Sequence, residues 1–231
     1  MFQHKKFLYL LSSLLLLAAA LNFSACELED LEDPNNPSSS AIENNATLAE
    51  IQNVVDGIQS GMRNNLPIYF DGVGVIGREF WRFSGSDPRY TQDLLGGDDA
   101  VLDPGGFYTT NAYSSRYRVI RNCYILDKAV ANTSAALTAE QRRAAAGFSK
   151  TIRGHQLLLV LTLQWANGIR IEVSDPDNLG PFVGENDPKV TLRAIAAILD
   201  EGYADLQAGG PTFPFTLRSG FTGFRTPADF G

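Results

Sequence analysis

The segment TAEQRRAAAGFSKTIRGHQLLLVLTLQWANG, residues 138–168, decides the fold of this chain. Thr138 and Gln141 have the spacing of a capping box, which starts a helix. A nearly continuous apolar run follows at 157–161, and Gly168 is typical of a helix end. A helix that is apolar on most faces must be covered by neighbouring elements. The segment therefore predicts the central helix of an all-α protein.

Further helices are indicated on both sides of this segment, because apolar residues recur there at spacings of three and four. We expect these helices at about residues 47–64, 67–83, 110–132 and 189–207. Gly- and Pro-rich stretches between them predict long connecting loops, notably at 84–109 and after Gly168.

The end of the sequence carries a helix start. Thr226 followed by Pro227 is typical of an N-cap with proline at the first helical position. The sequence stops four residues after Pro227, which is too short for a helix of ordinary length. We therefore expect an incomplete C-terminal part, with the remainder of the core supplied by residues beyond Gly231.

The N-terminal 25 residues have the layout of a secretory signal. Basic residues at 4–6 precede an apolar run at 7–21, which is shorter than the ~20 residues that a membrane-spanning helix needs. The run leads to Phe23-Ser24-Ala25-Cys26, which resembles the lipobox of bacterial lipoproteins. We predict a lipoprotein signal peptide over 1–25 and lipidation of Cys26, with an ordinary cleaved secretory protein as the alternative.

Residues 26–45 are expected to form a tether, since they are acidic and then rich in Pro, Asn and Ser without apolar periodicity. An acidic stretch behind the lipidated cysteine also resembles the surface-export signal of Bacteroidetes-type lipoproteins. The whole chain has 26 acidic against 19 basic residues and a net charge of −7, which argues against a nucleic-acid partner. Only Cys123 accompanies Cys26, so no disulfide framework is available, and we expect Cys123 to be buried.

Enzyme chemistry has no good candidates in this sequence. His155 is the one histidine after the signal segment, and we expect it to pack within its helix. Carboxylates gather in the tether and turns, so paired acid and base groups are missing. The segment Gly72-Val73-Gly74-Val75-Ile76-Gly77 matches a dinucleotide-binding pattern but lacks a strand before it, and Asp175 to Gly180 only faintly suggests a calcium loop. We predict no catalytic residues, no cofactor and no metal.

Three aromatic residues at the edge of the long loop are the best candidates for ligand contact, namely Trp81, Phe83 and Tyr90. Tyr113, Tyr117 and Tyr124 keep helical spacing and are expected in the core.

Several stretches together resemble the N-terminal part of the SusD/RagB family of nutrient-uptake lipoproteins. They are the lipobox with its acidic continuation, Tyr117 to Ala131, Ile152-Arg153-Gly154 through the leucine-rich helix to Gly168, Ile198 to Leu206, and Gly220-Phe221 through Thr226-Pro227-Ala228. The chain departs from the family pattern at His155-Gln156, where members usually carry Glu-Ala, and at Ile169 to Ile171, where a proline is usual.

The resemblance implies helix pairs of tetratricopeptide type over residues 46–231. It also implies an outer-membrane lipoprotein, facing the exterior, that binds oligosaccharide or peptide and passes it to a SusC-type TonB-dependent transporter barrel. The alternative is a structural or assembly lipoprotein whose helices bind another protein and no small ligand.

Overall fold

The computed structural model describes residues 39–82, 85–97 and 101–231, and this part of the chain is all-α with long connections. Ser39 to Gly231 form one compact unit. The predicted signal peptide, Cys26, the tether up to residue 38 and Phe83 lie outside the described residues. The helices are α2 (Ser39–Asn45), α3 (Leu48–Gly61), α4 (Leu66–Ile76), α5 (Arg89–Gln92), α6 (Phe107–Asn132), α7 (Ala139–Gln164), α8 (Pro188–Gln207) and α9 (Pro227–Phe230). Within the described ranges, no helix combines the length and the apolar character needed to cross a membrane.

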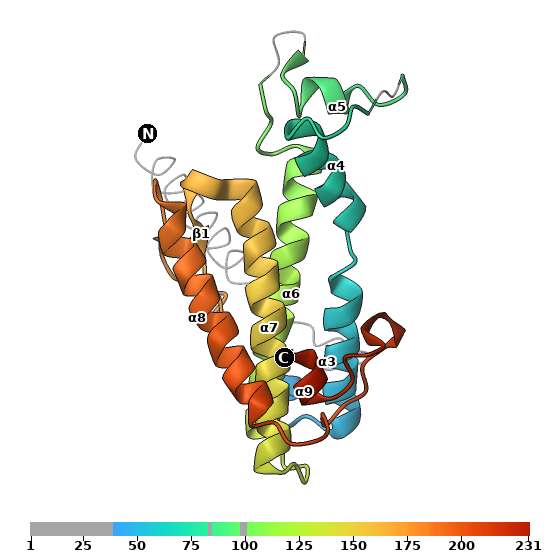
Figure 1. Cartoon of the computed structure of the whole chain (residues 1–231), viewed down its shortest axis with the longest axis vertical. Coiled ribbons are helices and arrows are strands. Elements are labelled where there is room, and N and C mark those ends of the chain that lie inside the picture. The colour runs from blue at the N-terminus through green and yellow to red at the C-terminus, as the bar shows by residue number, and fades with distance from the viewer. Residues whose placement is uncertain (1–38, 83–84, 98–100) are drawn as a thin grey trace, which may run out of the picture. The chain divides into compact units, whose positions relative to one another are not determined.

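The predicted central helix is confirmed as α7, which packs against α6 on one side and α8 on the other (Figure 1). The three helices run antiparallel in turn. Two glycines allow the close approach of α8: a Cβ at Gly147 would lie 2.6 Å from Leu206 Cγ, and one at Gly154 would lie 2.6 Å from Leu199 Cδ2. Shape, as well as hydrophobicity, therefore brings these two helices together.

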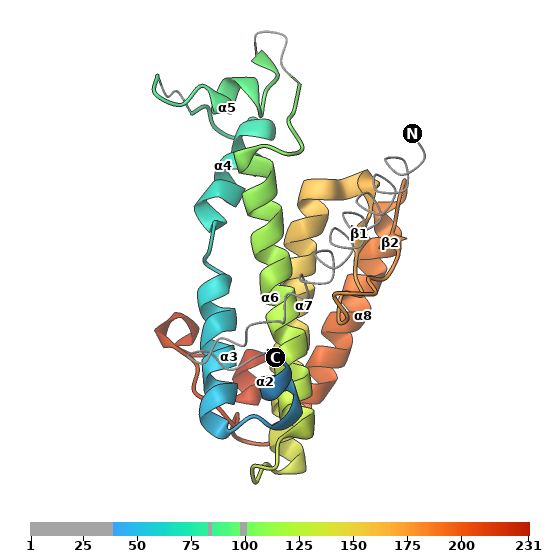
Figure 2. The same ribbon diagram turned by 180° about the vertical axis from the view of Figure 1, so that it is seen from behind.

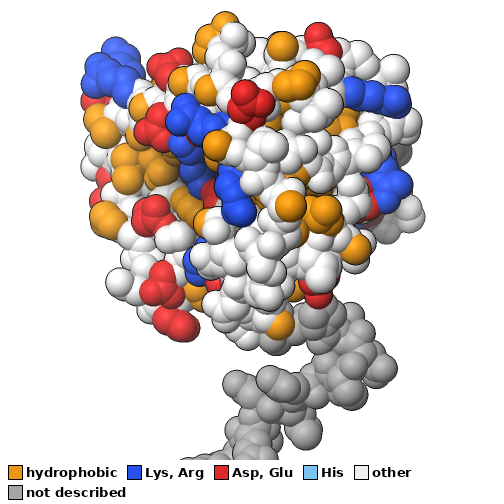
Figure 3. Space-filling view, turned by 90° about the horizontal axis from the view of Figure 1, so that it is seen from below, with side chains coloured by type: hydrophobic (Ala, Val, Ile, Leu, Met, Phe, Trp, Pro, Cys, Tyr) orange, Lys and Arg blue, Asp and Glu red, His pale blue; other side chains and the backbone are white. Residues whose placement is uncertain are grey.

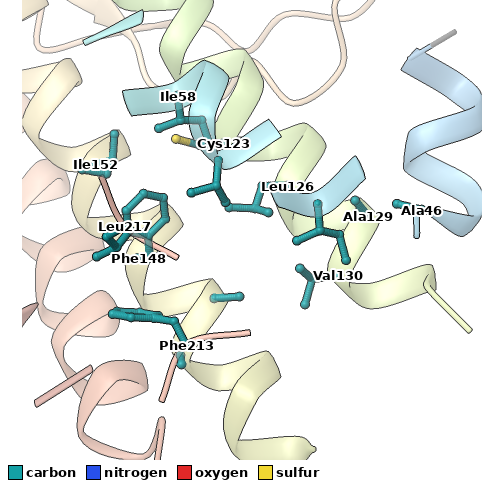
Figure 4. Packing of buried hydrophobic residues seen from close by; sticks show 14 of the residues in the cluster. Ala46, Ile58, Cys123, Leu126, Ala129, Val130, Phe148, Ile152, Phe213 and Leu217 are labelled. Atoms are coloured by element: carbon teal, nitrogen blue, oxygen red, sulfur yellow. The ribbon is translucent and has the colours of Figure 1, made fainter. Parts of the chain in front are cut away.

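The main core lies between α3, α6, α7 and the segment that follows α8 (Figure 4). Ile58 of α3, Leu126 of α6 and Phe148 of α7 are fully buried there. Phe213 and Phe215 from the C-terminal segment pack on Phe148, with ring centroids 6.2 and 5.2 Å from it. Cys123 is completely buried in the same cluster, as predicted, and burial raises the pKa of its thiol.

The caps that the sequence indicates are present. Thr47 and Thr138 each form a complete capping box, with Glu50 and Gln141 respectively. The Thr226 side chain accepts a hydrogen bond from the backbone of Asp229 at the start of α9. Helix α4 ends at Ile76, earlier than predicted, because Arg78 takes a left-handed conformation (φ 59°) directly after Gly77.

Further segments differ from the sequence-based expectation, and one of them is α5, which lies within the expected loop at 84–109. Residues 39–45, assigned to the tether, form α2 beside α6 (Figure 2). Glu43 of this helix pairs with Arg121 and Lys128 of α6, each at 2.9 Å. The sequence of α2 has no apolar periodicity from which the helix could be predicted. The loop after Gly168 contains a small antiparallel hairpin, in which β1 (Ile169–Arg170) pairs with β2 (Phe182–Val183).

Replacement by alanine should have opposite effects on stability at a glycine in the α7–α8 contact and at a helical glycine outside it. Gly147→Ala should lower the free energy of unfolding by about 1–2 kcal/mol, since overpacking outweighs the gain in helix propensity. Gly72→Ala in α4 is the control, because a Cβ there meets nothing within 4 Å. It should raise stability by up to about 1 kcal/mol. Urea denaturation of both variants measures this, and an equal response at the two sites would contradict the packing argument.

Candidate functional site

An open hollow of about 810 Å³ lies where α4 ends and the α5 region begins, and we call it the upper hollow. Its wall combines exposed aromatic rings with charged and polar side chains. The lining residues are Val75, Arg78, Glu79, Phe80, Trp81, Thr91, Leu95 and Gly97. Trp81 is 64% exposed and Phe80 is 46% exposed, so both rings are available to a ligand. Apolar faces next to a few polar groups are typical of sites that bind small molecules.

A buried tyrosine pair stands behind the upper hollow. Tyr90 and Tyr108 have ring centroids 4.6 Å apart and belong to a small separate core with Val75 and Leu94. The Tyr90 hydroxyl donates to Asp71 Oδ2 at 3.0 Å, and burial raises the pKa of this phenol. The Arg82 guanidinium stacks on the Tyr90 ring at 4.3 Å and pairs with Asp71. These contacts tie Arg82, the residue after Trp81, to Asp71 of α4 and to Tyr90 of α5.

Asp87 ties α5 to the start of α6. Arg89 donates to both carboxylate oxygens of Asp87, at 2.8 and 2.9 Å, and the Tyr108 hydroxyl donates to Oδ2 at 2.8 Å. The hydrogen bonds from Arg89, followed by that from Tyr108, hold the pKa of the Asp87 carboxyl well below its usual range. The charged form of Asp87 therefore stabilises this region.

The three predicted ligand residues have different places. Trp81 lines the upper hollow, and Phe83 lies outside the described residues. Tyr90 is only 4% exposed, so direct ligand contact does not fit its position. The Tyr90 ring is covered by Arg82 and Tyr108, so it supports the wall of the hollow and does not face a ligand. The position of Tyr90 in the sequence does not indicate this burial.

A second aromatic groove, of about 500 Å³, lies between α6 and the hairpin region, and we call it the tyrosine groove. Tyr113 and Tyr117, expected in the core, are only partly buried and line it, with ring centroids 4.9 Å apart. The Tyr117 hydroxyl donates to the Arg170 carbonyl at 2.9 Å, which fixes that ring. The exposed Arg118 side chain also lines the groove and has no hydrogen bond or ion pair within the described ranges. Helical spacing locates these tyrosines on one face, but it does not reveal that the face borders a groove.

The weaker motifs do not form sites in the described part of the chain. The glycine pattern at 72–77 lies within α4 and at its end, so the strand-to-helix turn of a dinucleotide site is absent there. Asp175 accepts a hydrogen bond from the backbone of Asp177 at 3.0 Å, which is an ordinary turn. Across the residues with assigned positions, no group of three or more His, Cys, Asp or Glu side chains could hold a metal.

The surface at the other end of the helices has a mixed composition. Viewed from the end where α6 finishes and α7 begins, hydrophobic, acidic and basic side chains are interspersed (Figure 3).

Comparison with known proteins assigns no relative: no family model, no curated protein and no solved structure matches the chain.

The Asp87 contacts predict a pH-dependent and mutation-sensitive α5 region. Because the pKa of Asp87 is lower in the folded state, its stabilisation is complete above the unfolded value of about 4 and declines as pH falls below it. Asp87→Asn at pH 7 should therefore reproduce the acid effect, with faster amide hydrogen exchange in α5 and around Tyr108. Asp93→Asn is the control, since Asp93 makes no side-chain hydrogen bond or ion pair with described residues. Unchanged exchange in Asp87→Asn would refute this role.

Proposed function

We propose that this protein is a nutrient-binding lipoprotein of the SusD/RagB type, anchored in the outer membrane through Cys26 and facing the exterior. It binds an oligosaccharide or a peptide and passes it to a SusC-type TonB-dependent transporter barrel. It does so by binding alone, without chemistry of its own.

The anchor and the destination are argued from the N-terminal sequence. Small residues lead into Cys26 after a short apolar run, and acidic residues follow it at once. Several acyl chains on one cysteine would make release from the membrane negligible, since each buried methylene contributes about 0.8 kcal/mol.

The upper hollow is the observation that carries the binding role. A sugar ring presents an apolar face and a polar edge, and an aromatic ring beside charged side chains matches both. Trp81 offers such a face, with Arg78 and Glu79 in the same wall. The Tyr90–Tyr108 pair and its hydrogen bonds would keep this wall in place before a ligand arrives, which lowers the entropic cost of binding.

The arrangement of the helices supports the proposal of a SusD/RagB-type protein. Consecutive antiparallel helices α6, α7 and α8 pack as neighbours, as tetratricopeptide-type pairs do. Small residues at the α7–α8 contact, such as Gly147 and Gly202, suit the close packing of such pairs.

A structural or assembly lipoprotein is the second candidate, and exposed apolar side chains favour it. Phe70 and Ile76 of α4 are 55% and 47% exposed, on the same helix that leads to Trp81. An apolar surface of this kind also suits a protein partner. The two candidates differ in whether a small ligand binds at Trp81.

Cys26→Ala should remove lipidation, so metabolic labelling with palmitate should be lost and the protein should leave the membrane fraction. Cys123→Ala is the matched control, because the Cys123 thiol is buried and lies far along the chain. It should keep both the label and the membrane location. A Cys26→Ala protein that stays labelled would overturn the anchor.

Trp81→Ala should weaken binding of the cognate oligosaccharide or peptide about tenfold, which corresponds to about 1.4 kcal/mol for one lost aromatic contact. Trp165→Phe is the control, since Trp165 is also exposed, at 55%, and is not part of the upper hollow. Calorimetric titration against panels of glycans and peptides measures both variants. The Trp165→Phe protein also leaves Trp81 as a single fluorescent reporter for the same titration.

Copurification separates the two candidates. Recovery of a TonB-dependent barrel together with a saturable glycan or peptide signal supports nutrient uptake. A protein partner without a barrel, and without any ligand in either panel, favours the assembly role.

A further inference from the structure

Two adjoining hollows lie between α7, the residues after α3 and the C-terminal segment. Their volumes are about 360 and 230 Å³, and both are lined by Met62, His155, Gly220 and Phe221. We call them together the His155 groove. It is separate from the upper hollow and from the tyrosine groove, with which it shares no lining residue.

The wall of the groove formed by the C-terminal segment is fixed by two glutamines of α3. Gln52 exchanges two hydrogen bonds with the backbone of Thr216, at 3.0 and 2.7 Å. Gln59 Oε1 accepts from the backbone of Arg218 at 2.8 Å, and the Arg218 guanidinium pairs with Asp56. Asp56 thus neutralises Arg218, and the wall exists before any ligand arrives.

A buried positive charge lies behind the groove. Arg116 of α6 is fully buried, and among the described residues its guanidinium donates only to neutral groups. These are the Met62 carbonyl at 2.9 Å, the Asn64 carbonyl and Gln156 Oε1 at 2.9 Å. Its Nε has no partner in the described structure. No carboxylate of the described residues pairs with this guanidinium, so its field extends to the surroundings.

The charge of Arg116 determines the tautomer of the His155 imidazole. An arginine can only donate, so Gln156 must turn its carbonyl oxygen to Arg116 and its amide nitrogen to His155 Nδ1, at 2.9 Å. Nδ1 then accepts, and the imidazole proton resides on Nε2. Desolvation and the Arg116 charge both lower the pKa of His155, which favours this neutral form. His155 Nε2–H is consequently left as a donor.

The groove has one basic arm and one apolar arm. Arg63 lines the basic arm and is exposed, and its guanidinium makes no hydrogen bond or ion pair with any described residue. Phe221, Phe224 and Ile152 line the apolar arm. Among the described residues that line either hollow, none is acidic. An anion attached to an apolar body matches this distribution of charge and surface.

We propose that the His155 groove binds a small carboxylate with an apolar or aromatic body. The carboxylate accepts hydrogen bonds from Arg63 and from His155 Nε2–H, and the body lies against Phe221 and Phe224. The proposal does not depend on the nutrient-binding role of the upper hollow.

The test uses 3-phenylpropionate as the probe and the imidazole signals of His155 as the reporter, in the protein labelled with ¹³C-histidine. We expect saturable shifts of these signals. Arg63→Gln should weaken the affinity about tenfold or more, because it removes a charge-assisted hydrogen bond. Arg118→Gln is the matched control, since Arg118 is likewise exposed and unpaired among the described residues but lines the tyrosine groove. Its affinity should not change.

Two further probes separate charge from apolar contact. 3-Phenylpropanamide keeps the body without the charge, and acetate keeps the charge without the body. Both should bind at least tenfold more weakly than 3-phenylpropionate. The proposal is overturned by the absence of saturable shifts at His155, by equal affinity for the amide, or by equal losses in Arg63→Gln and Arg118→Gln.

Discussion

The close contact between α7 and α8 is the constraint on which the rest of the structure depends. At Gly147 a Cβ would lie 2.9 Å from the Gly202 carbonyl oxygen, so the two backbones approach as nearly as glycine permits. This contact sets the direction in which the chain leaves α8. The following residues then cross α7 at Phe148, where Phe213 and Phe215 pack, and reach α3. The core and the His155 groove both follow from that path.

The helices could be predicted from the sequence where local signals and burial agree. Thr47 and Thr138 start α3 and α7 as expected, because a capping box is a local interaction over four residues. Helix α2 could not be predicted in this way. Its Glu43 pairs with residues of α6 that are about eighty positions away, and such pairing leaves no periodic pattern in the sequence. The hairpin at Ile169 has strands of two residues, which is too short for an alternating pattern to register.

The candidate site could be predicted only in part, because the sequence shows local signals and does not show long-range contacts. A tryptophan beside a long loop is easily recognised as a candidate for exposure, and Trp81 is exposed. Tyr90 lies in the same neighbourhood but is buried by Arg82 and Tyr108, and only the folded chain brings those side chains together. Conversely, Tyr113 and Tyr117 have the spacing of core residues, yet the hairpin region leaves a groove over them. Burial of an aromatic ring is therefore decided by long-range contacts that spacing does not encode.

Arg116 shows how one buried side chain links the fold to a surface. The carbonyls that it binds, from Met62 and Asn64, follow directly after α3, where a helix leaves unpaired acceptors and the negative end of its dipole. A cation is stabilised at such a place, which explains how the charge is tolerated although no described carboxylate pairs with it. The guanidinium also donates to Gln156, and this hydrogen bond orients the Gln156 amide group. The amide nitrogen of Gln156 in turn fixes the tautomer of His155. The residue that satisfies the end of α3 therefore also determines which donor the His155 groove offers, and a change at Arg116 would alter both at once.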